Sequence, residues 1–108
     1  MKIYGQTQDI IVREMVKSDC EKFLEMMTEH GTNEDFTVWD IENLWEIRKK
    51  RKYIQCTVTS IDGSVVYGFC GVVHGKLCVD LLRNYLQYEE QTEKITEKLY
   101  ISYHEALK

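Results

Sequence analysis

The chain has 108 residues, of which 44% are hydrophobic and 30% charged, and its formal net charge is −4. This balance is typical of a globular protein rather than a disordered or membrane-embedded one, and the length suits a single domain over residues 1–108. The negative charge argues against nonspecific nucleic-acid binding, which usually needs a basic surface.

The first half of the chain predicts one strand followed by two helices. The apolar run from Ile10 to Met15 indicates the strand. Ser18 and Glu21 then form an S-x-x-E capping box, and apolar residues follow at helical spacing as far as Gly31, a natural helix stop. A second helix with its own capping pair is expected to end in the basic run 48–52, whose charge complements the helix dipole.

The second half predicts three antiparallel strands and a final helix. Asp62-Gly63 is a strong signal for a two-residue type I′ turn, and His74-Gly75 can turn the chain again. The strands are expected at 53–60, 65–73 and 76–82, and the helix at 91–108.

The turns also predict which strand residues face each other. If both contain two residues, Cys56 lies opposite Phe69, and Phe69 lies opposite Asp80. Cys56 and Cys78 would then share one face of the sheet and Cys70 the other. Both faces of the central strand are apolar, so helices should cover both sides. A bulge in either hairpin would change this register.

Two segments carry a family resemblance. Ile11-Val12-Arg13-Glu14-Met15 with Ser18-Asp19-Cys20 is similar to the opening of the GNAT superfamily of N-acetyltransferases. Asp62-Gly63-Ser64-Val65-Val66-Tyr67-Gly68-Phe69-Cys70-Gly71 resembles the family's DGxxVGFxG hairpin. The resemblance implies an α/β (α+β) fold with a GNAT-like mixed sheet, order β-α-α-β-β-β-α, and helices on both faces. Full members continue past the last helix, so we expect a truncated domain that lacks the C-terminal strands.

The same resemblance implies a degenerate acetyl-CoA motif. The family's Q/R-x-x-G-x-G/A sequence falls on Gln91-Thr92-Glu93-Lys94-Ile95-Thr96. Gln91 fits, but Lys94 and Thr96 replace the glycines that let backbone amides approach a pyrophosphate. These three residues are the cofactor-binding positions that the resemblance implies. We expect no cofactor and favour a non-enzyme; the alternative is an acetyl-CoA-dependent N-acetyltransferase completed by oligomerisation.

Asp80 is the one catalytic candidate. Burial beside Phe69 would raise the pKa of Asp80 toward the range useful to a general base. The favoured interpretation is a polar residue where the helical layer ends.

The expected interface lies along the strand 76–82. In a full family member another strand would lie beside this one, so an uncovered edge here invites pairing with another chain. The residues expected at this interface are Leu77, Val79, Leu81, Tyr85 and Tyr88. Residues 83–90 could instead fold back over the edge, and the tyrosines could pack under the final helix. The leading hypothesis is a small regulator or inhibitor that binds a protein partner or forms a homo-oligomer.

The remaining signals indicate structural roles. Four cysteines without a signal sequence suggest reduced core residues in a cytoplasmic protein, and their spacing is not a zinc-site pattern, so no metal is expected. No apolar stretch is long enough to span a bilayer, so no membrane partner is expected. The basic run 48–52 leaves a nucleic-acid-binding module as a second alternative, although such runs are usually solvated helix ends.

Overall fold

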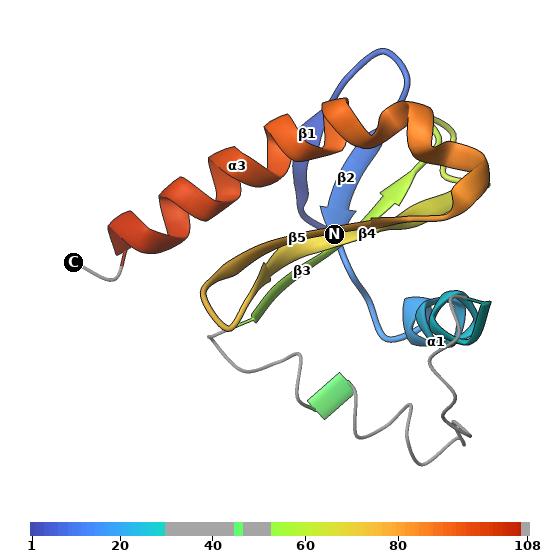
Figure 1. Cartoon of the computed structure of the whole chain (residues 1–108), viewed down its shortest axis with the longest axis horizontal. Coiled ribbons are helices and arrows are strands. Elements are labelled where there is room, and N and C mark those ends of the chain that lie inside the picture. The colour runs from blue at the N-terminus through green and yellow to red at the C-terminus, as the bar shows by residue number, and fades with distance from the viewer. Residues whose placement is uncertain (30–44, 47–52, 107–108) are drawn as a thin grey trace.

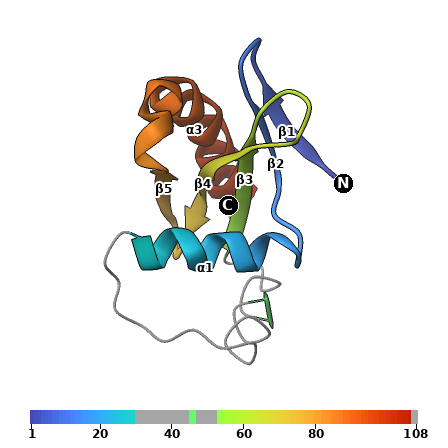
Figure 2. The same cartoon turned by 90° about the vertical axis from the view of Figure 1, so that its right-hand side faces the viewer.

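The computed structural model describes residues 1–29, 45–46 and 53–106. Its described strands form one antiparallel sheet of five strands in the order β1-β2-β3-β4-β5. The strands are β1 (Ile3–Gln6), β2 (Ile11–Glu14), β3 (Tyr53–Thr59), β4 (Val66–Val73) and β5 (Lys76–Leu81). Helix α1 (Asp19–Glu29) lies on one face of the sheet and α3 (Glu89–Ala106) on the other, as Figures 1 and 2 show. A short 3₁₀ helix, η1 (Arg83–Tyr88), leads into α3.

The predicted α+β class and the helices on both faces are confirmed, but the predicted mixed sheet is wrong for the described strands, whose pairings are all antiparallel. Strand β1 is absent from the elements that the sequence predicts. Its turn into β2 is held by Thr7, whose amide donates to the Ile10 carbonyl at 2.9 Å and whose hydroxyl accepts from the Asp9 amide at 3.1 Å. The predicted Gly31 stop, most of the second helix and the basic run 48–52 lie outside the described residues.

The register between β4 and β5 is as predicted, with Phe69 opposite Asp80. Its two-residue turn uses positive φ angles at His74 (53°) and Gly75 (75°), as a type I′ turn requires. The predicted register between β3 and β4 is wrong by one residue, because Cys56 pairs with Cys70.

The register error has a local cause in the β3–β4 hairpin, but not in the length of its loop. The Ser60 amide donates to the Val65 carbonyl at 3.0 Å, so the loop contains four residues instead of two, and Ser60 and Val65 still face each other as the predicted two-residue turn requires. An irregularity between Val58 and Thr59 then shifts the pairing by one residue. A one-residue shift moves every later side chain of a strand to the opposite face.

Two hydrophobic clusters result, one on each face of the sheet. The α3 side contains Ile10, Val12, Cys56, Val58, Tyr67, Cys70 and Leu81, with Ile95 and Leu99 of α3 packed against them. The α1 side contains Met15, Cys20, Met26 and Phe69. The central strand β4 approaches its neighbours closely, since a Cβ atom added at Gly71 would lie only 1.8 Å from the Ile54 carbonyl oxygen.

Helix α3 crosses its face of the sheet from the β1–β2 turn to the β4–β5 turn. Near its start, Gln91 accepts a hydrogen bond from the Thr7 hydroxyl and donates to Asp9 at 3.0 Å. Near its end, His104 Nε2 lies 3.2 Å from the Gly75 carbonyl oxygen. The helix begins at Glu89, two residues before the predicted start, because η1 runs directly into it.

Candidate interface at the edge strand

Strand β5 has one side without a neighbour in the described sheet. The Leu82 amide donates to the Tyr67 carbonyl of β4 at 2.9 Å. Backbone groups alternate in direction along an antiparallel strand, so the N–H and C=O groups of Leu77 and Val79 point away from β4. Among the described residues, no hydrogen bond reaches these outward groups from outside the strand. The predicted uncovered edge is therefore present in this part of the chain.

The other edge of the sheet is less suited to pairing. Strand β1 has four residues, and its register with β2 is irregular between Ile3 and Gly5. Strand β5 has six residues and pairs with β4 without a shift. Short length and bulges are common ways of protecting a sheet edge, so β5 is the more exposed template for an added strand.

The side chains of β5 divide between the two faces. Leu77 and Val79 point toward the α3 side, where Val79 packs partly on the core and Leu77 remains 36% exposed. Leu81 is buried, so its side chain belongs to the core rather than to an open interface. Lys76 and Asp80 are exposed on the other side, where Asp80 borders a small apolar hollow next to Phe23 and Phe69.

The segment after β5 does not form another strand along the edge. Residues 83–88 form η1, and the rings of Tyr85 and Tyr88 pack on Tyr67, with centroid distances of 4.5 and 4.7 Å. Both tyrosines belong to the cluster on the α3 side. They are therefore partly buried within their own chain, as the alternative interpretation had it.

The structure removes the premise for Asp80 as a general base. The residue lies opposite Phe69 as predicted, but its side chain is exposed at the sheet edge. Its neighbour on the same face is Cys78. Burial, followed by the negative charge of Asp80, raises the pKa of the Cys78 thiol, which makes this cysteine a weaker nucleophile at neutral pH.

The three cofactor positions do not converge on an open helix start. Gln91 is engaged with the β1–β2 turn, and Lys94 forms an exposed ion pair with Glu90 at 3.4 Å. Thr96 is fully buried and donates to the Thr92 carbonyl at 2.7 Å. Because α3 begins at Glu89, the amides of Lys94 and Thr96 lie inside the helix, where they donate to carbonyls four residues earlier.

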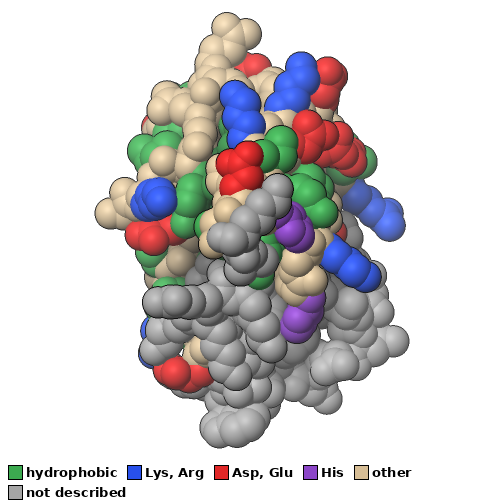
Figure 3. All heavy atoms as spheres, turned by 90° about the vertical axis from the view of Figure 1, so that its left-hand side faces the viewer, with side chains coloured by type: hydrophobic (Ala, Val, Ile, Leu, Met, Phe, Trp, Pro, Cys, Tyr) green, Lys and Arg blue, Asp and Glu red, His purple; other side chains and the backbone are tan. Residues whose placement is uncertain are grey.

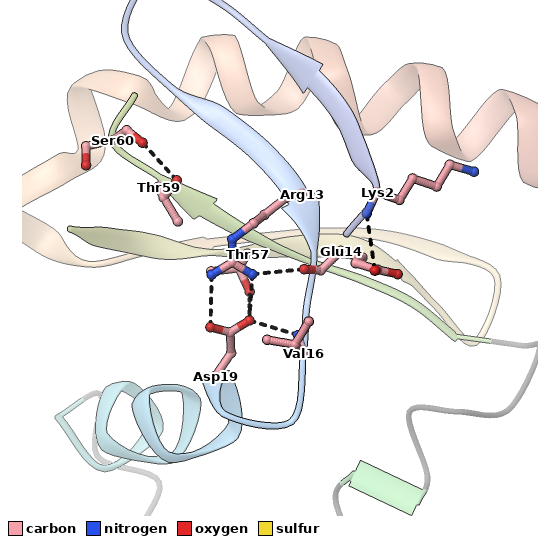
Figure 4. A network of polar contacts seen from close by, with 8 residues as sticks. All are labelled: Lys2, Arg13, Glu14, Val16, Asp19, Thr57, Thr59 and Ser60. Carbon is pink, nitrogen blue, oxygen red and sulfur yellow. Dashed lines mark hydrogen bonds and ion pairs between the residues drawn. The ribbon is translucent and has the colours of Figure 1, made fainter. Parts of the chain in front are cut away.

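A polar network that the sequence did not predict lies at the start of α1 (Figure 4). Arg13 of β2 holds Asp19 through two hydrogen bonds of 2.7 and 3.0 Å. Asp19 also accepts from the Val16 amide at 2.8 Å and from the Thr57 hydroxyl at 2.9 Å. Asp19, rather than the predicted Ser18 and Glu21 capping box, thus carries the polar contacts described at this helix start.

The charge state of Asp19 follows from these contacts. Burial of Asp19 acts to raise its pKa, but the bonds from Arg13, Val16 and Thr57 outweigh burial, and the net pKa is lowered. The carboxylate is therefore ionised at neutral pH. A compact, fully bonded ion pair of this kind ties a strand, a helix start and a second strand together, which is a structural role.

The cysteine arrangement differs from the prediction. None of the four forms a disulfide. Cys56 and Cys70 are direct neighbours on the α3 side, and hydrogen bonds, from Cys56 first and from Thr96 with a smaller effect, lower the pKa of Cys70 despite its burial. Cys78 lies on the opposite face. Within the described residues, no group of three histidine, cysteine or acidic side chains is placed to hold a metal ion.

Two further surface properties concern possible partners. Neither described helix is long and apolar enough to cross a membrane. The face shown in Figure 3 has acidic and basic side chains intermingled, with hydrophobic ones between them. The basic run behind the nucleic-acid alternative lies outside the described residues.

Comparison of this chain with protein-family models, curated proteins and solved structures finds no match.

Proposed function

We propose that this protein is a non-catalytic, GNAT-like domain that acts by binding another protein chain through the edge of β5. The observation that carries the proposal is the regular six-residue edge strand whose outward groups at Leu77 and Val79 have no partner among the described residues. A partner strand would supply those hydrogen bonds, and the exposed Leu77 would gain apolar cover.

The GNAT-like part of the proposal is supported by the order of the elements. Strand β2, helix α1, the β3-β4-β5 meander and helix α3 occur in the sequence of elements that the resemblance implies, apart from its second helix, most of which lies outside the described residues, and α1 and α3 lie on opposite faces. Strand β1 is an addition to that order. The non-catalytic part is supported by the scattered positions of Gln91, Lys94 and Thr96 and by the exposure of Asp80.

The proposal is tested by photo-crosslinking from the edge in cells. A photoreactive amino acid at Asp80 should give discrete protein adducts, whereas the same group at Gln8, in the β1–β2 turn, should not. Val79→Pro should abolish the adducts, because it removes an outward N–H while the bonds to β4 remain. Val79→Ala is the matched control, since it shortens the side chain and keeps the donor.

Circular dichroism must show that both Val79 variants are folded. Adducts that persist in the folded Val79→Pro variant, or an absence of adducts from Asp80, would overturn the proposal.

A further inference from the structure

We propose that the chain paired with β5 is a second copy of this protein, bound antiparallel about a two-fold axis at Cys78. This inference rests on the proposed function, because it names the partner of the same edge. Its basis is the self-complementarity of the sequence Lys76-Leu77-Cys78-Val79-Asp80 in its observed orientation.

The backbone permits only some registers. In an antiparallel pair, residues whose N–H and C=O groups point outward must face each other. A two-fold axis at Cys78 meets this condition, because it sets Leu77 of each copy opposite Val79 of the other copy. Leu77 and Val79 lie on the α3 side in both copies, so the two pairs form an apolar contact on one face of the joined sheet.

The charges select this register among those allowed. With the axis at Cys78, Lys76 of each copy lies opposite Asp80 of the other, and both residues are exposed on the same face. Opposite charges directly across two strands are favourable, and like charges are unfavourable. An axis at Val79 would instead set Lys76 opposite Leu82, and an axis at Asp80 would set two carboxylates against each other.

The resulting dimer has an isologous interface, as closed two-fold assemblies do. It joins two five-stranded sheets into one continuous sheet, with both α3 helices on one side and both α1 helices on the other. In this dimer each copy covers the β5 edge of the other, so no third copy can bind through β5.

The register also provides a chemical reporter. Cys78 faces Cys78 of the second copy in a non-hydrogen-bonded pair, where Cα atoms lie about 4.5 Å apart. That separation lies within the range of disulfides, about 4.4–6.8 Å. The other three cysteines are buried in their own chain, whereas Cys78 is partly exposed.

The first test is oxidation of the purified protein with diamide, which takes up the electrons lost as two thiols form one disulfide. The expected product is a covalent dimer that forms with the wild type and not with Cys78→Ser. The Cys78→Ser variant should still sediment as a dimer, since the disulfide only reports the pairing. A wild type that remains monomeric at high concentration, with no covalent dimer, would overturn the inference.

Charge reversal tests the register with residues that are exposed and therefore tolerant of substitution. Lys76→Asp and Asp80→Lys each place like charges opposite each other twice, so each should weaken the homodimer roughly tenfold or more. Mixing the two variants should restore pairing as a heterodimer, because their charges are then complementary. Two weakened variants that fail to pair when mixed would overturn the register.

The outcomes also separate this inference from the proposed function. Asp80 crosslinks to a different protein, with no adduct between copies, would overturn the self-pairing and leave the edge-binding function standing. The absence of any adduct would overturn both.

Discussion

Asp19 shows how much of this fold depends on one side chain. Its carboxylate joins Arg13 of β2, the Val16 amide before α1, and Thr57 of β3, and Thr57 is itself completely buried. Buried polar groups are stable only when they are hydrogen-bonded, so each member of this network depends on the others. The sequence places Thr57 far from Asp19, and no local pattern could have predicted their contact.

We expect Asp19→Asn to destabilise the protein at pH 7 by about 3 kcal/mol, because it leaves the Arg13 charge without its partner. Thr57→Val should cost less, about 1.5 kcal/mol, for one hydrogen bond to a charged group. Urea unfolding measures the free energy of unfolding of both variants and of the wild type. Glu25→Gln is the control, since Glu25 pairs with Lys22 on the exposed surface and its loss should change little.

The pH dependence of the same variant gives a second check. The folded-state pKa of Asp19 lies below the ordinary value of an aspartate, so the ionised carboxylate stabilises the fold at pH values above that ordinary pKa. This contribution is lost as the pH falls through the lower, folded-state pKa. The stability difference between wild type and Asp19→Asn should therefore shrink in acid, and a difference that is constant between pH 7 and pH 2 would contradict the assignment.

At the scale of elements, the sequence predicts which segments are helices and strands better than it predicts which strand residues pair. The strands β2 to β5 and the helices α1 and α3 follow from hydrophobic spacing and turn residues. The β3–β4 register does not, because the irregularity between Val58 and Thr59 shifts the pairing by one residue and no turn residue marks it in the sequence. The loop itself is shaped by Asp62, which accepts hydrogen bonds from Ser60 and Ser64. These bonds, the Ser64 amide first, lower the pKa of Asp62 to about 2. Strand β1 was missed because its short, mixed sequence has no clear alternation.

Gln91 is expected to act as the tether between α3 and the β1–β2 hairpin. Its bonds to Thr7 and Asp9 lie beside the contact of Gly5 with Ile95. Gln91→Ala should cost about 1 kcal/mol and speed hydrogen exchange in β1 but not in β5. Gln87→Ala, at an exposed position in η1, is the control. Unchanged exchange in β1 would show that the side chain has no tethering role.

At the scale of the whole molecule, sequence reasoning located the open edge of the described sheet at Leu77 and Val79. It left open whether Tyr85 and Tyr88 face outward or pack inward, because their stacking on Tyr67 depends on the direction in which the chain leaves β5. It also could not place Gln91, whose partners lie more than 80 residues earlier.

Acetyl-CoA is expected to leave the melting temperature unchanged. A ligand present at a hundredfold excess over its Kd stabilises the native state by about 2.7 kcal/mol. For a domain of this size, that corresponds to a shift of roughly 10 °C or more. A thermal-shift titration to millimolar acetyl-CoA therefore has ample sensitivity, with Gln91→Ala as a parallel sample. A saturable shift of several degrees in the wild type would contradict the non-catalytic proposal.

The order of strands in the sheet has a consequence for how the chain is made. Each strand pairs with the one synthesised before it, so the growing sheet presents a new edge after each strand, and β5 is the last of them in the described sheet. The β3–β4 and β4–β5 hairpins are local in sequence and form quickly, whereas β2 must pair with β3 across residues 15–52. On a polysome, where nascent copies are close together, β5 emerges before α3 is available to cover its face. Assembly through this edge would then compete with aggregation during translation, and the opposite charges of Lys76 and Asp80 would favour the correct register over random pairing.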